Sequence, residues 1–424
     1  MILLVIGSGG REHAIAAALV KHPAVAKLYA IPGNGGIAEI AECVPDIKAT
    51  ELVKIREFAL AHGVNFAIPA ADDPLVAGAV DLLENAGIPC FGPGKAAAAI
   101  EGSKVFSKAL MQKYNIPTAA FADFSEPNAA LAYVEQASTF PLVIKADGLA
   151  LGKGVIIAPD KPAALAAVRD MMETKKFGAS GNSIVIEEFL TGPEVSVLSF
   201  TDGKTIVPMV ASTDHKRAKD GDGGLNTGGM GTIAPSPYYT REIAARCMEE
   251  IFLPTIRAMQ AEGCPFKGCL YFGLMLTAQG PKVIEYNCRF GDPEAQVVLP
   301  LLDSELLDIF LAVQAGTLDR CPVRWKPGAA ACVVIASGGY PEKYQTGFPI
   351  TFGALGEAFI YHAGTKRAAD GTAVTAGGRV LNVCAMGADL PQALQKAYAA
   401  AADICFEGAF YRKDIGKKAL EAAR

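Results

Sequence analysis

The residue types with the clearest chemical potential lie in one run, residues 283–294, which reads VIEYNCRFGDPE. If the start of this run is a β-strand, its side chains alternate between two faces. One face then carries Val283, Glu285, Asn287 and Arg289, and the other carries Ile284, Tyr286, Cys288 and Phe290. The second set suits a hydrophobic core. The first set places a carboxylate, an amide oxygen and a guanidinium in a row, which is costly to bury unless a ligand binds there.

Glu285 and Asn287 carry hard oxygen ligands of the kind that Mg²⁺ takes from proteins, usually in small number and completed by substrate phosphates. Arg289 follows on the same face, where a guanidinium could bind a carboxylate or a phosphate. Alternation alone also fits a half-exposed edge strand with a solvated polar face. The Gly-Asp-Pro-Glu sequence at 291–294 adds carboxylates directly afterwards and favours a binding site.

The first of two glycine-rich tracts, GSGGREH at residues 7–13, follows an apolar strand pattern and opens a helix. Backbone N–H groups at such a turn attract anions. A dinucleotide-binding turn needs a small residue where Glu12 stands, and an acidic residue after the second strand, where residues 31–34 read IPGN. The sequence therefore favours a phosphate on a small substrate over NAD, with a simple tight turn packed on its helix as the alternative.

The second tract, KADGLALGKGV at residues 145–155, connects two strand patterns. Glycine allows close backbone approach and lysine supplies charge, a combination suited to a mobile flap over phosphates. The tract is not a Walker A loop, because the spacing between Gly148 and Gly152 is one residue short and Gly154 stands where Ser or Thr is required. An ordinary flexible hairpin is the alternative.

Residues 184–194, IVIEEFLTGPE, describe a strand that leaves its sheet. Backbone groups near 188–190 could bind an adenine edge and Glu194 could accept from ribose hydroxyls, although these residues alone favour a plain strand with exposed acids. DHKR at 214–217 and NTGGMG at 226–231 flank a polar loop of a kind that orders on a ligand. The sequence has no Ser-His-Asp or Cys-His grouping and no HExxH motif, so hydrolytic mechanisms have little support.

The bulk composition limits these possibilities. The chain has 424 residues, of which 51% are hydrophobic, enough for about two to four domains with large cores. A net charge of −5 argues against a broad nucleic-acid surface, and no apolar run reaches membrane-spanning length. The 10 Cys residues are scattered without a CxxC pair, as in a reduced cytosolic protein.

The elements that must position these motifs follow an α/β order. Residues 1–100 alternate short strands at 2–6, 26–31, 66–69 and 89–92 with helices at 12–21, 51–62 and 75–86. This rhythm predicts a parallel sheet covered on both faces. The later segments are a well-capped helix at 103–114, a strand–helix–strand unit at 120–190, a strand-rich part at 194–300, a linker at 321–327 and an α+β unit at 329–424.

Taken in order, these motifs resemble the glycinamide ribonucleotide synthetase (phosphoribosylamine–glycine ligase) family of the ATP-grasp superfamily, over essentially the whole chain. The matching segments are 9–14, 101–104, 145–155, 214–217, 226–231, 284–294, 362–366 and 411–416. The chain departs from the family where Ala70-Ala71 replaces Gly-Pro before the acidic pair Asp72-Asp73, close to the expected phosphoribosylamine pocket. Leu151 and Leu225 also replace the residues usual in the family.

The resemblance implies an α/β fold in three parts. These are an N-terminal parallel-sheet α/β domain at 1–102, an ATP-grasp core at 103–320 with an inserted small lobe at about 120–191, and a C-terminal α+β domain at 328–424. It implies that ATP, glycine and 5-phosphoribosylamine give glycinamide ribonucleotide, ADP and phosphate through a glycyl phosphate, in purine biosynthesis. Positioning and charge neutralisation should then dominate catalysis, because a carboxylate is already a nucleophile.

The resemblance also assigns residues. Mg²⁺ or Mn²⁺ would be bound by Glu285 and Asn287. ATP would contact Lys104, Lys145, Gly152 and Lys153 through its phosphates, Glu187, Glu188, Phe189 and Leu190 through adenine, and Glu194 through ribose. The substrates would be bound by Gly9, Gly10, Arg11, Glu12, Asp214, Arg289, Gly291 and Asp292, with Arg289, Asp292 and Lys145 in catalytic roles.

The expected partners are the small molecules glycine and 5-phosphoribosylamine, with no nucleic acid and no membrane, and the expected state is a cytoplasmic monomer.

Two other classes of enzyme stay open. Another ATP-grasp ligase or carboxylase would share the core, but HAGTK at 362–366 and the DHKR and NTGGMG pair argue against it. An NAD(P)-dependent oxidoreductase would use the N-terminal sheet, but Glu12 and the missing acid after the second strand argue against it.

Overall fold

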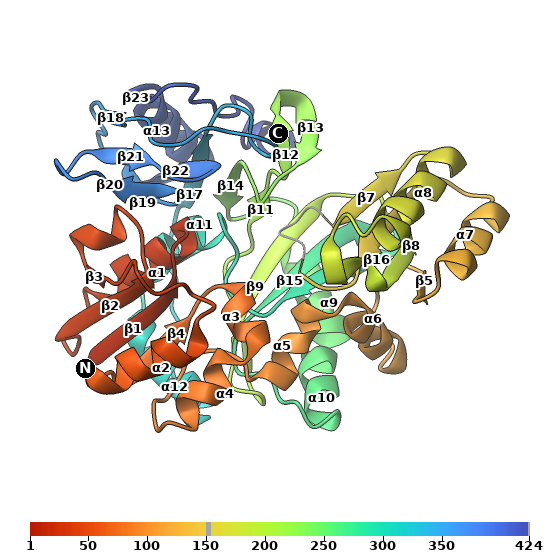
Figure 1. The fold of residues 1–424 in the computed structure, drawn as a ribbon, viewed down its shortest axis with the longest axis horizontal. Helices are drawn as coiled ribbons and strands as arrows, with labels where there is room; N and C mark the ends of the chain where they lie inside the picture. Colours follow the sequence, from red (N-terminus) through yellow and green to blue (C-terminus); the bar gives the residue numbers. More distant parts are fainter. Residues whose placement is uncertain (150–153, 423–424) are drawn as a thin grey trace.

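The N-terminal region is built on a four-stranded parallel sheet with the order β3-β2-β1-β4 (Figure 1). The computed structural model describes residues 1–149 and 154–422. The strands are β1 (Ile2–Gly7), β2 (Lys27–Pro32), β3 (Glu42–Cys43) and β4 (Phe66–Pro69), and the helices are α1 (Gly10–Leu19), α2 (Leu52–Ala61), α3 (Asp72–Ala77), α4 (Ala79–Glu84) and α5 (Lys95–Gly102). β1 and β4 are almost wholly buried, which explains their continuous apolar sequences. The parallel sheet predicted here is confirmed.

Two predicted elements of this region are wrong in detail. Residues 75–86 form two helices instead of one, because Gly78 adopts a left-handed conformation (φ 97°) between α3 and α4. Residues 89–92 contribute an isolated bridge between Ala67 and Cys90 in place of the expected strand.

A four-stranded antiparallel sheet with the order β5-β8-β6-β7 forms the predicted small lobe. Its strands are β5 (Phe121–Phe124), β6 (Leu142–Ala146), β7 (Val155–Ala158) and β8 (Ile184–Glu188), and its helices are α7 (Pro127–Gln136) and α8 (Lys161–Val168). Sheet and helices share a core that includes Ile144, Val168 and Ile186. Helix α6 (Lys104–Lys113) precedes the lobe and begins, as predicted, at Ser103, whose Oγ accepts a hydrogen bond from the N–H of Phe106 (3.1 Å).

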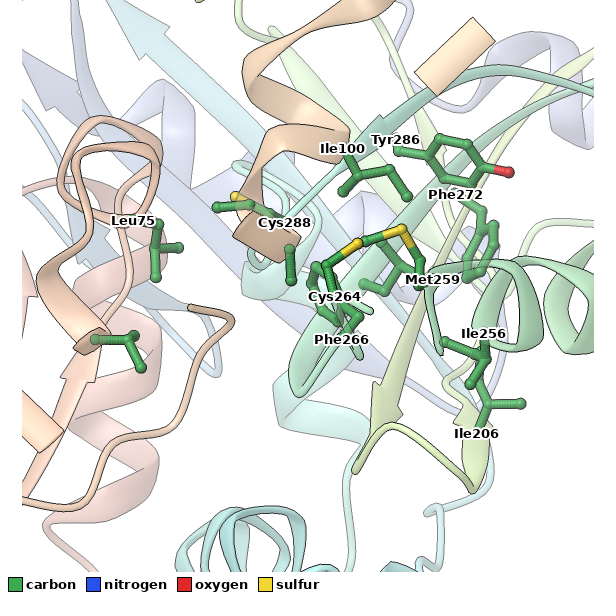
Figure 2. Close-up of a cluster of buried hydrophobic side chains, with 14 of the residues drawn as sticks. Leu75, Ile100, Ile206, Ile256, Met259, Cys264, Phe266, Phe272, Tyr286 and Cys288 are labelled. Carbon is green, nitrogen blue, oxygen red and sulfur yellow. The ribbon is translucent and has the colours of Figure 1, made fainter. Parts of the chain in front are cut away.

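A second antiparallel sheet, β10-β9-β15-β16, carries the start of the 283–294 run. Its strands are β9 (Glu194–Thr201), β10 (Ile206–Pro208), β15 (Gly268–Thr277) and β16 (Gly280–Asn287). Helices α9 (Arg241–Cys247) and α10 (Leu253–Ala261) cover one face, where Figure 2 shows Ile256 and Met259 of α10 packed with Phe272 and Tyr286 of the sheet. Helix α12 (Leu306–Ala315) packs on the other face, and α11 (Ala295–Leu301) packs against α1 and β17. With both faces covered, little of the sheet is left for a ligand except one end.

A bulge in β16 corrects one prediction. Two adjacent residues of β15 pair with Val283 and Glu285, so Ile284 is an extra residue in the strand. The prediction that Val283 shares a face with Glu285 is wrong for this reason, and Val283 is instead buried in the same core as Tyr286. The pairing is regular beyond the bulge, which leaves Glu285 and Asn287 on one face as predicted.

The C-terminal region centres on a five-stranded sheet with the order β11-β14-β17-β22-β19, on which α13 (Leu390–Ala402) packs (Figure 1). Its strands are β11 (Thr213–Asp214), β14 (Gly231–Ala234), β17 (Ala329–Ala336), β19 (Phe359–His362) and β22 (Arg379–Gly387). The short elements are β12 (Arg217–Lys219), β13 (Gly223–Asn226), β18 (Thr351–Phe352), β20 (Thr365–Arg367), β21 (Ala373–Thr375), β23 (Ile404–Cys405) and α14 (Lys417–Ala422). Because β11 and β14 come from the middle of the chain, the ATP-grasp core and the C-terminal region share this sheet.

Helix α1 meets strand β19 through two buried histidines. The N–H of His362 donates to Nδ1 of His13 (2.9 Å), and the ring centroids lie 5.8 Å apart. Burial lowers the pKa of His13 to about 3 and that of His362 to about 4. Both rings are therefore neutral in the folded chain at pH values where the unfolded chain binds protons.

We expect the free energy of unfolding to fall when the pH is lowered from 7 to 5. The unfolded histidines take up protons near pH 6.5, whereas the folded ones resist protonation, so each costs about 2 kcal/mol of stability at pH 5. Urea denaturation at both pH values measures this loss. In the matched variant His13→Asn, an amide oxygen replaces the Nδ1 acceptor without titrating, and the loss should shrink by about 2 kcal/mol. An unchanged loss contradicts the assignment.

Candidate functional site

Glu285 of β16 lies in an ion-pair network with a lysine from the connection between β11 and β12. Nζ of Lys216 lies 3.3 Å from Oε1 of Glu285 and 3.1 Å from Oε2 of Glu194. The Lys216 ammonium lowers the pKa of Glu285 to about 2, so this carboxylate is ionised at neutral pH. The Glu285 side chain is 38% exposed and can therefore still reach a ligand. Sequence reasoning does not single out Lys216, although it belongs to the DHKR segment.

The oxygen donors on this face of β16 fit a divalent cation that substrate completes. Glu285 supplies an ionised carboxylate, and Asn287 supplies an amide Oδ1 that accepts one hydrogen bond from Nη2 of Arg289 (3.1 Å). That oxygen has a second lone pair for a metal. Within residues 1–149 and 154–422, no group of three or more His, Cys, Asp or Glu side chains is placed to hold a metal. This sparse all-oxygen donor set suits Mg²⁺, which keeps water and phosphate ligands.

Two lysines from different elements lie beside Glu285. Nζ of Lys145, on β6, donates to the carbonyl of the bulge residue Ile284 (2.8 Å). Nζ of Lys104, at the start of α6, donates to the carbonyl of Gly148 (2.8 Å), and burial lowers the pKa of this lysine. Both ammonium groups add to the lowering of the pKa of Glu285. Lys104 and Lys145, both predicted to contact phosphates, therefore lie beside Glu285, the predicted metal ligand. Gly152 and Lys153, predicted for the same task, lie outside the described residues.

The predicted adenine strip begins at the end of β8. The Glu187 side chain is 3% exposed, and its Oε1 lies 3.0 Å from Nζ of Lys145. Oε1 of Glu188 accepts a backbone hydrogen bond from the start of the small lobe (2.9 Å). Phe189 is exposed and Leu190 is partly exposed. Because the Glu187 carboxylate is engaged by lysine, the backbone and the outer side chains of this strip are the parts left to contact a base.

Arg289 is anchored by an acid that sequence reasoning missed. Its Nη2 lies 2.8 Å from Oε1 of Glu101, whose Oε2 accepts the N–H of Cys288 (2.7 Å). The signal for Glu101 was its place in the matching segment 101–104. Nε of Arg289 is buried and has no hydrogen-bond partner among the described residues. A buried donor in this state is the kind of group that a bound carboxylate or phosphate satisfies.

The N-terminal glycine turn adjoins the same site. Oε2 of the buried Glu12 accepts the N–H of Gly9 (2.6 Å), and its Oε1 accepts the Nε–H of Arg11 (2.7 Å). Nη1 of Arg11 donates to the carbonyl of Phe290 (3.0 Å), just beyond β16. A methyl group on Gly9 would lie 2.7 Å from Oε2 of Glu12 and 3.1 Å from Oδ2 of Asp292. Packing therefore requires this glycine, and the N–H expected to face a phosphate is engaged by Glu12.

Asp292 is fixed from the C-terminal region. Its Oδ2 lies 3.1 Å from Nη2 of Arg379, and its Oδ1 accepts a hydrogen bond from Nε2 of Gln296. Nη1 of Arg379 donates to the carbonyls of Asp292 (2.7 Å) and Gly228 (2.7 Å). Burial raises the pKa of Asp292, but Arg379 and neighbouring cations outweigh burial and keep this pKa below its ordinary value. Gln296 also closes over Gly10, where a methyl group would lie 2.6 Å from Nε2.

Asp214 and Gly291, the remaining predicted substrate contacts, both lie beside Glu294. Glu294 is buried, and its Oε1 accepts a hydrogen bond from Oγ of Ser196 (3.2 Å). Burial, and after it the charge of Glu294, raises the pKa of Asp214 well above its ordinary value. A side chain on Gly291 would overlap the Glu294 carboxylate. The site therefore has an acidic side next to the cationic side formed by its lysines.

We expect Gly9→Ala to weaken the fold at the site. The added methyl group would approach Glu12 and Asp292 closely enough to displace one of them, at a cost of about 1–3 kcal/mol. Urea unfolding measures the loss. Gly223→Ala is the matched control, because the nearest atoms to a methyl group there lie at 3.3 and 3.7 Å. Equal stability of the two variants contradicts this account of the turn.

Comparison with protein families gives three matches in chain order. The N domain of phosphoribosylglycinamide synthetase matches residues 1–101, its ATP-grasp (A) domain matches residues 102–295, and its C domain matches residues 330–418. The matches confirm the fold class expected from the sequence, which is an N-terminal parallel-sheet domain, an ATP-grasp domain and a C-terminal domain.

Individual proteins agree with these matches. The phosphoribosylamine–glycine ligase of Caldanaerobacter subterraneus subsp. tengcongensis is 45% identical over 416 residues, covering 98% of this chain and 99% of that protein. A crystal structure of phosphoribosylamine–glycine ligase from Thermotoga maritima superposes with a TM-score of 0.86 at 35% identity, covering 98% of this chain and 100% of the other. The biotin carboxylase domain of 2-oxoglutarate carboxylase from Hydrogenobacter thermophilus superposes with a TM-score of 0.74 at 15% identity over 96% of this chain and 91% of its own, which is a likeness of fold alone.

Proposed function

The chain belongs to the phosphoribosylglycinamide synthetase family, and we propose that it joins glycine to 5-phosphoribosylamine, with cleavage of ATP, to give glycinamide ribonucleotide, ADP and phosphate in purine biosynthesis. Relatives that match it over their whole length are named for this ligase activity, which supports the proposal. The observation that carries it is the placement of Glu285, Asn287 and Arg289 on one end of a strand, beside the lysines of two other elements.

ATP would lie between the lysines and β16. Lys104, Lys145, Gly152 and Lys153 would contact its phosphates, while residues 187–190 would contact adenine and Glu194 the ribose. Glu285 and Asn287 would hold Mg²⁺, or Mn²⁺ in its place, which when bound would neutralise charge on the phosphates. The ionised state of Glu285 and the free lone pair of Asn287 support this assignment.

Glycine would lie against Arg289 and Asp292. The unsatisfied Nε–H of Arg289 would bind the glycine carboxylate, and the ionised Asp292 would attract the ammonium group. Attack of that carboxylate on the γ-phosphorus of ATP would release ADP and form glycyl phosphate, as in phosphoryl transfer by positioning and charge. The chain needs no nucleophile of its own. Burial raises the pKa of the Cys288 thiol well above its ordinary value, and this side chain lies in the core.

Phosphoribosylamine would enter from the N-terminal side. Its amine would attack the carbonyl carbon of glycyl phosphate and displace phosphate, forming the amide bond. Residues 9–12 would seat this substrate, with Asp214 and Gly291 on the acidic side of the site. The contact between the glycine turn and Asp292 supports a path for this substrate to the reacting carbon.

A different ATP-grasp carboxylate–amine ligase or a carboxylase is the second candidate, because the core fold is shared. The ordered match of all three domains favours the first proposal. An oxidoreductase that uses NAD(P) has less support, because Glu12 engages the N–H of Gly9 at the position where a dinucleotide pyrophosphate would bind.

The predictions on partners and location accompany this proposal. Small-molecule substrates follow from the ligase activity, and a monomer in the cytoplasm without nucleic-acid or membrane partners remains a prediction. The net charge of −5 supports the absence of a nucleic-acid partner. Within the described residues, every helix is too short or too polar to cross a membrane.

Glu285→Ala should lower the release of ADP in the presence of glycine and phosphoribosylamine by at least about 100-fold at saturating Mg²⁺. The fold should remain, because Lys216 keeps its pairing with Glu194. A coupled ADP assay and thermal unfolding measure the two effects. Glu250→Ala is the control, since it removes a glutamate from a surface ion pair with Arg246. Turnover of Glu285→Ala near that of the unchanged chain would reject the metal assignment.

The reaction should release ADP and phosphate and pass through an acyl phosphate. ¹⁸O placed in the glycine carboxylate should therefore appear in the released phosphate, because that oxygen bridges carbon and phosphorus before the amine attacks. Mass spectrometry of the phosphate measures the transfer. Release of AMP and pyrophosphate, or label confined to the amide product, would reject this mechanism even with the same substrates.

A further inference from the structure

A buried cluster joins helix α6 to the small lobe through one shared carboxylate oxygen. Oε1 of Glu187, on β8, lies 3.0 Å from Nζ of Lys145 and 3.2 Å from Nζ of Lys108. The side chains are 3% exposed for Glu187, 9% for Lys145 and 3% for Lys108. Lys108 lies one turn after Lys104 on α6 and is not among the residues proposed to contact ATP or the substrates.

The surroundings of the two lysines differ. Nζ of Lys108 donates to Oγ1 of Thr118 (2.8 Å) and lies 5.3 Å from the centre of the Phe121 ring. Nζ of Lys145 donates to the carbonyl of Ile284 (2.8 Å), next to the proposed metal ligand. Lys108 is therefore held by Thr118 and Glu187, whereas Lys145 is the member of the cluster that also bonds to the residue before the proposed metal ligand.

The cluster contains two positive charges and one negative charge. Glu187 alone cannot neutralise both ammonium groups, and a further carboxylate that interacts with Lys145 is that of Glu285, the proposed metal ligand. Burial lowers the pKa of Lys108 to about 8, against the attraction of Glu187, which reflects how costly this second cation is.

We propose that Lys108 is a positioning residue for ATP: by pairing with the Glu187 carboxylate, it weakens the pairing of Glu187 with Lys145 and leaves more of the Lys145 charge for the phosphates. This inference rests on the proposed function. Without Lys108, Glu187 and Lys145 would form a neutral pair, and the attraction of Lys145 for a phosphate would fall. Lys108 acts through Glu187 and makes no contact with substrate.

Titration calorimetry of Mg-ADP binding tests the inference without relying on turnover. Lys108→Met should raise the Kd of Mg-ADP about tenfold, and in steady-state kinetics it should raise the KM for ATP by a similar factor while the KM for glycine stays within about twofold. Lys108→Arg, which keeps the cation, should recover most of this loss. Lys113→Met is the matched control on the same helix, because Lys113 is exposed and pairs with Glu262.

The double variant Lys108→Met/Glu187→Gln separates positioning from a merely structural role. Removing the carboxylate as well should free Lys145 again, so the double variant should bind Mg-ADP more tightly than Lys108→Met. In the double variant Lys145 has no carboxylate partner within the cluster, as the inference requires, and this variant serves as the test if the single variant does not fold. Weaker binding by the double than by the single variant, or a tenfold loss in the double variant when only it folds, would overturn the inference. So would an unchanged Kd in Lys108→Met.

The outcomes also distinguish this inference from the proposed function. If the unchanged chain binds Mg-ADP but releases no ADP with glycine and phosphoribosylamine, the proposed substrates are wrong and the calorimetric comparison still tests Lys108. If the unchanged chain turns over as proposed but the variants do not bind Mg-ADP in the expected order, only the role given to Lys108 is wrong, and the proposed function stands.

Discussion

The site depends on the backbone of residues 283–290 being fixed from separate parts of the chain. Thr118 donates to the carbonyl of Val283, Lys145 to that of Ile284 and Arg11 to that of Phe290, while Glu101 accepts the N–H of Cys288. These anchors come from the N-terminal region, the start of the ATP-grasp core and the small lobe. The side chains of Glu285, Asn287 and Arg289 stand between them. A shift of any one of these regions relative to β16 would therefore move the side chains of Glu285, Asn287 and Arg289. Holding these side chains in position thus depends on several regions of the chain.

Charges in the site are shared, and few form simple pairs. Glu187 lies between two lysines, Lys216 lies between two glutamates, and Asp292 lies between an arginine and an amide. Removing one member of a buried network leaves another charge without compensation, which costs several kcal/mol in typical proteins. Each shared group thus constrains its neighbours. The Nε–H of Arg289, which has no hydrogen-bond partner among the described residues, and the Lys145 ammonium are the groups that anionic substrates would complete.

Local sequence patterns predicted the elements whose contacts are local. The parallel N-terminal sheet, the start of α6 at Ser103 and the polar face of β16 all follow from periodicity and capping. The face of Val283 could not be predicted, because a bulge is visible only in the pairing with β15. The break at Gly78 was missed because the apolar period continues through it.

The site residues also differ in whether neighbouring residues or distant parts of the chain determine their contacts. That Glu285 and Asn287 share one face was predictable from one segment, whereas the lysines beside Glu285, Lys104 and Lys145, were expected only from the family resemblance. Glu101, Lys108, Lys216 and Arg379 escaped assignment because each acquires its role from a partner far away in the chain. A lysine on a helix reads as a solvated group until its carboxylate partner is known.

The C-terminal region illustrates this dependence on distant partners. Arg412 is 2% exposed and donates to Asp414, to Asp222 (2.9 Å) and to the carbonyl of Arg217 (3.1 Å). These bonds hold the β12–β13 hairpin, whose first residue directly follows Lys216. Since Lys216 sets the ionisation of Glu285, the charge on the proposed metal ligand depends on a segment almost two hundred residues later in the chain. The C-terminal region is therefore part of the site electrostatically, through the β12–β13 hairpin and through Arg379, which pairs with Asp292.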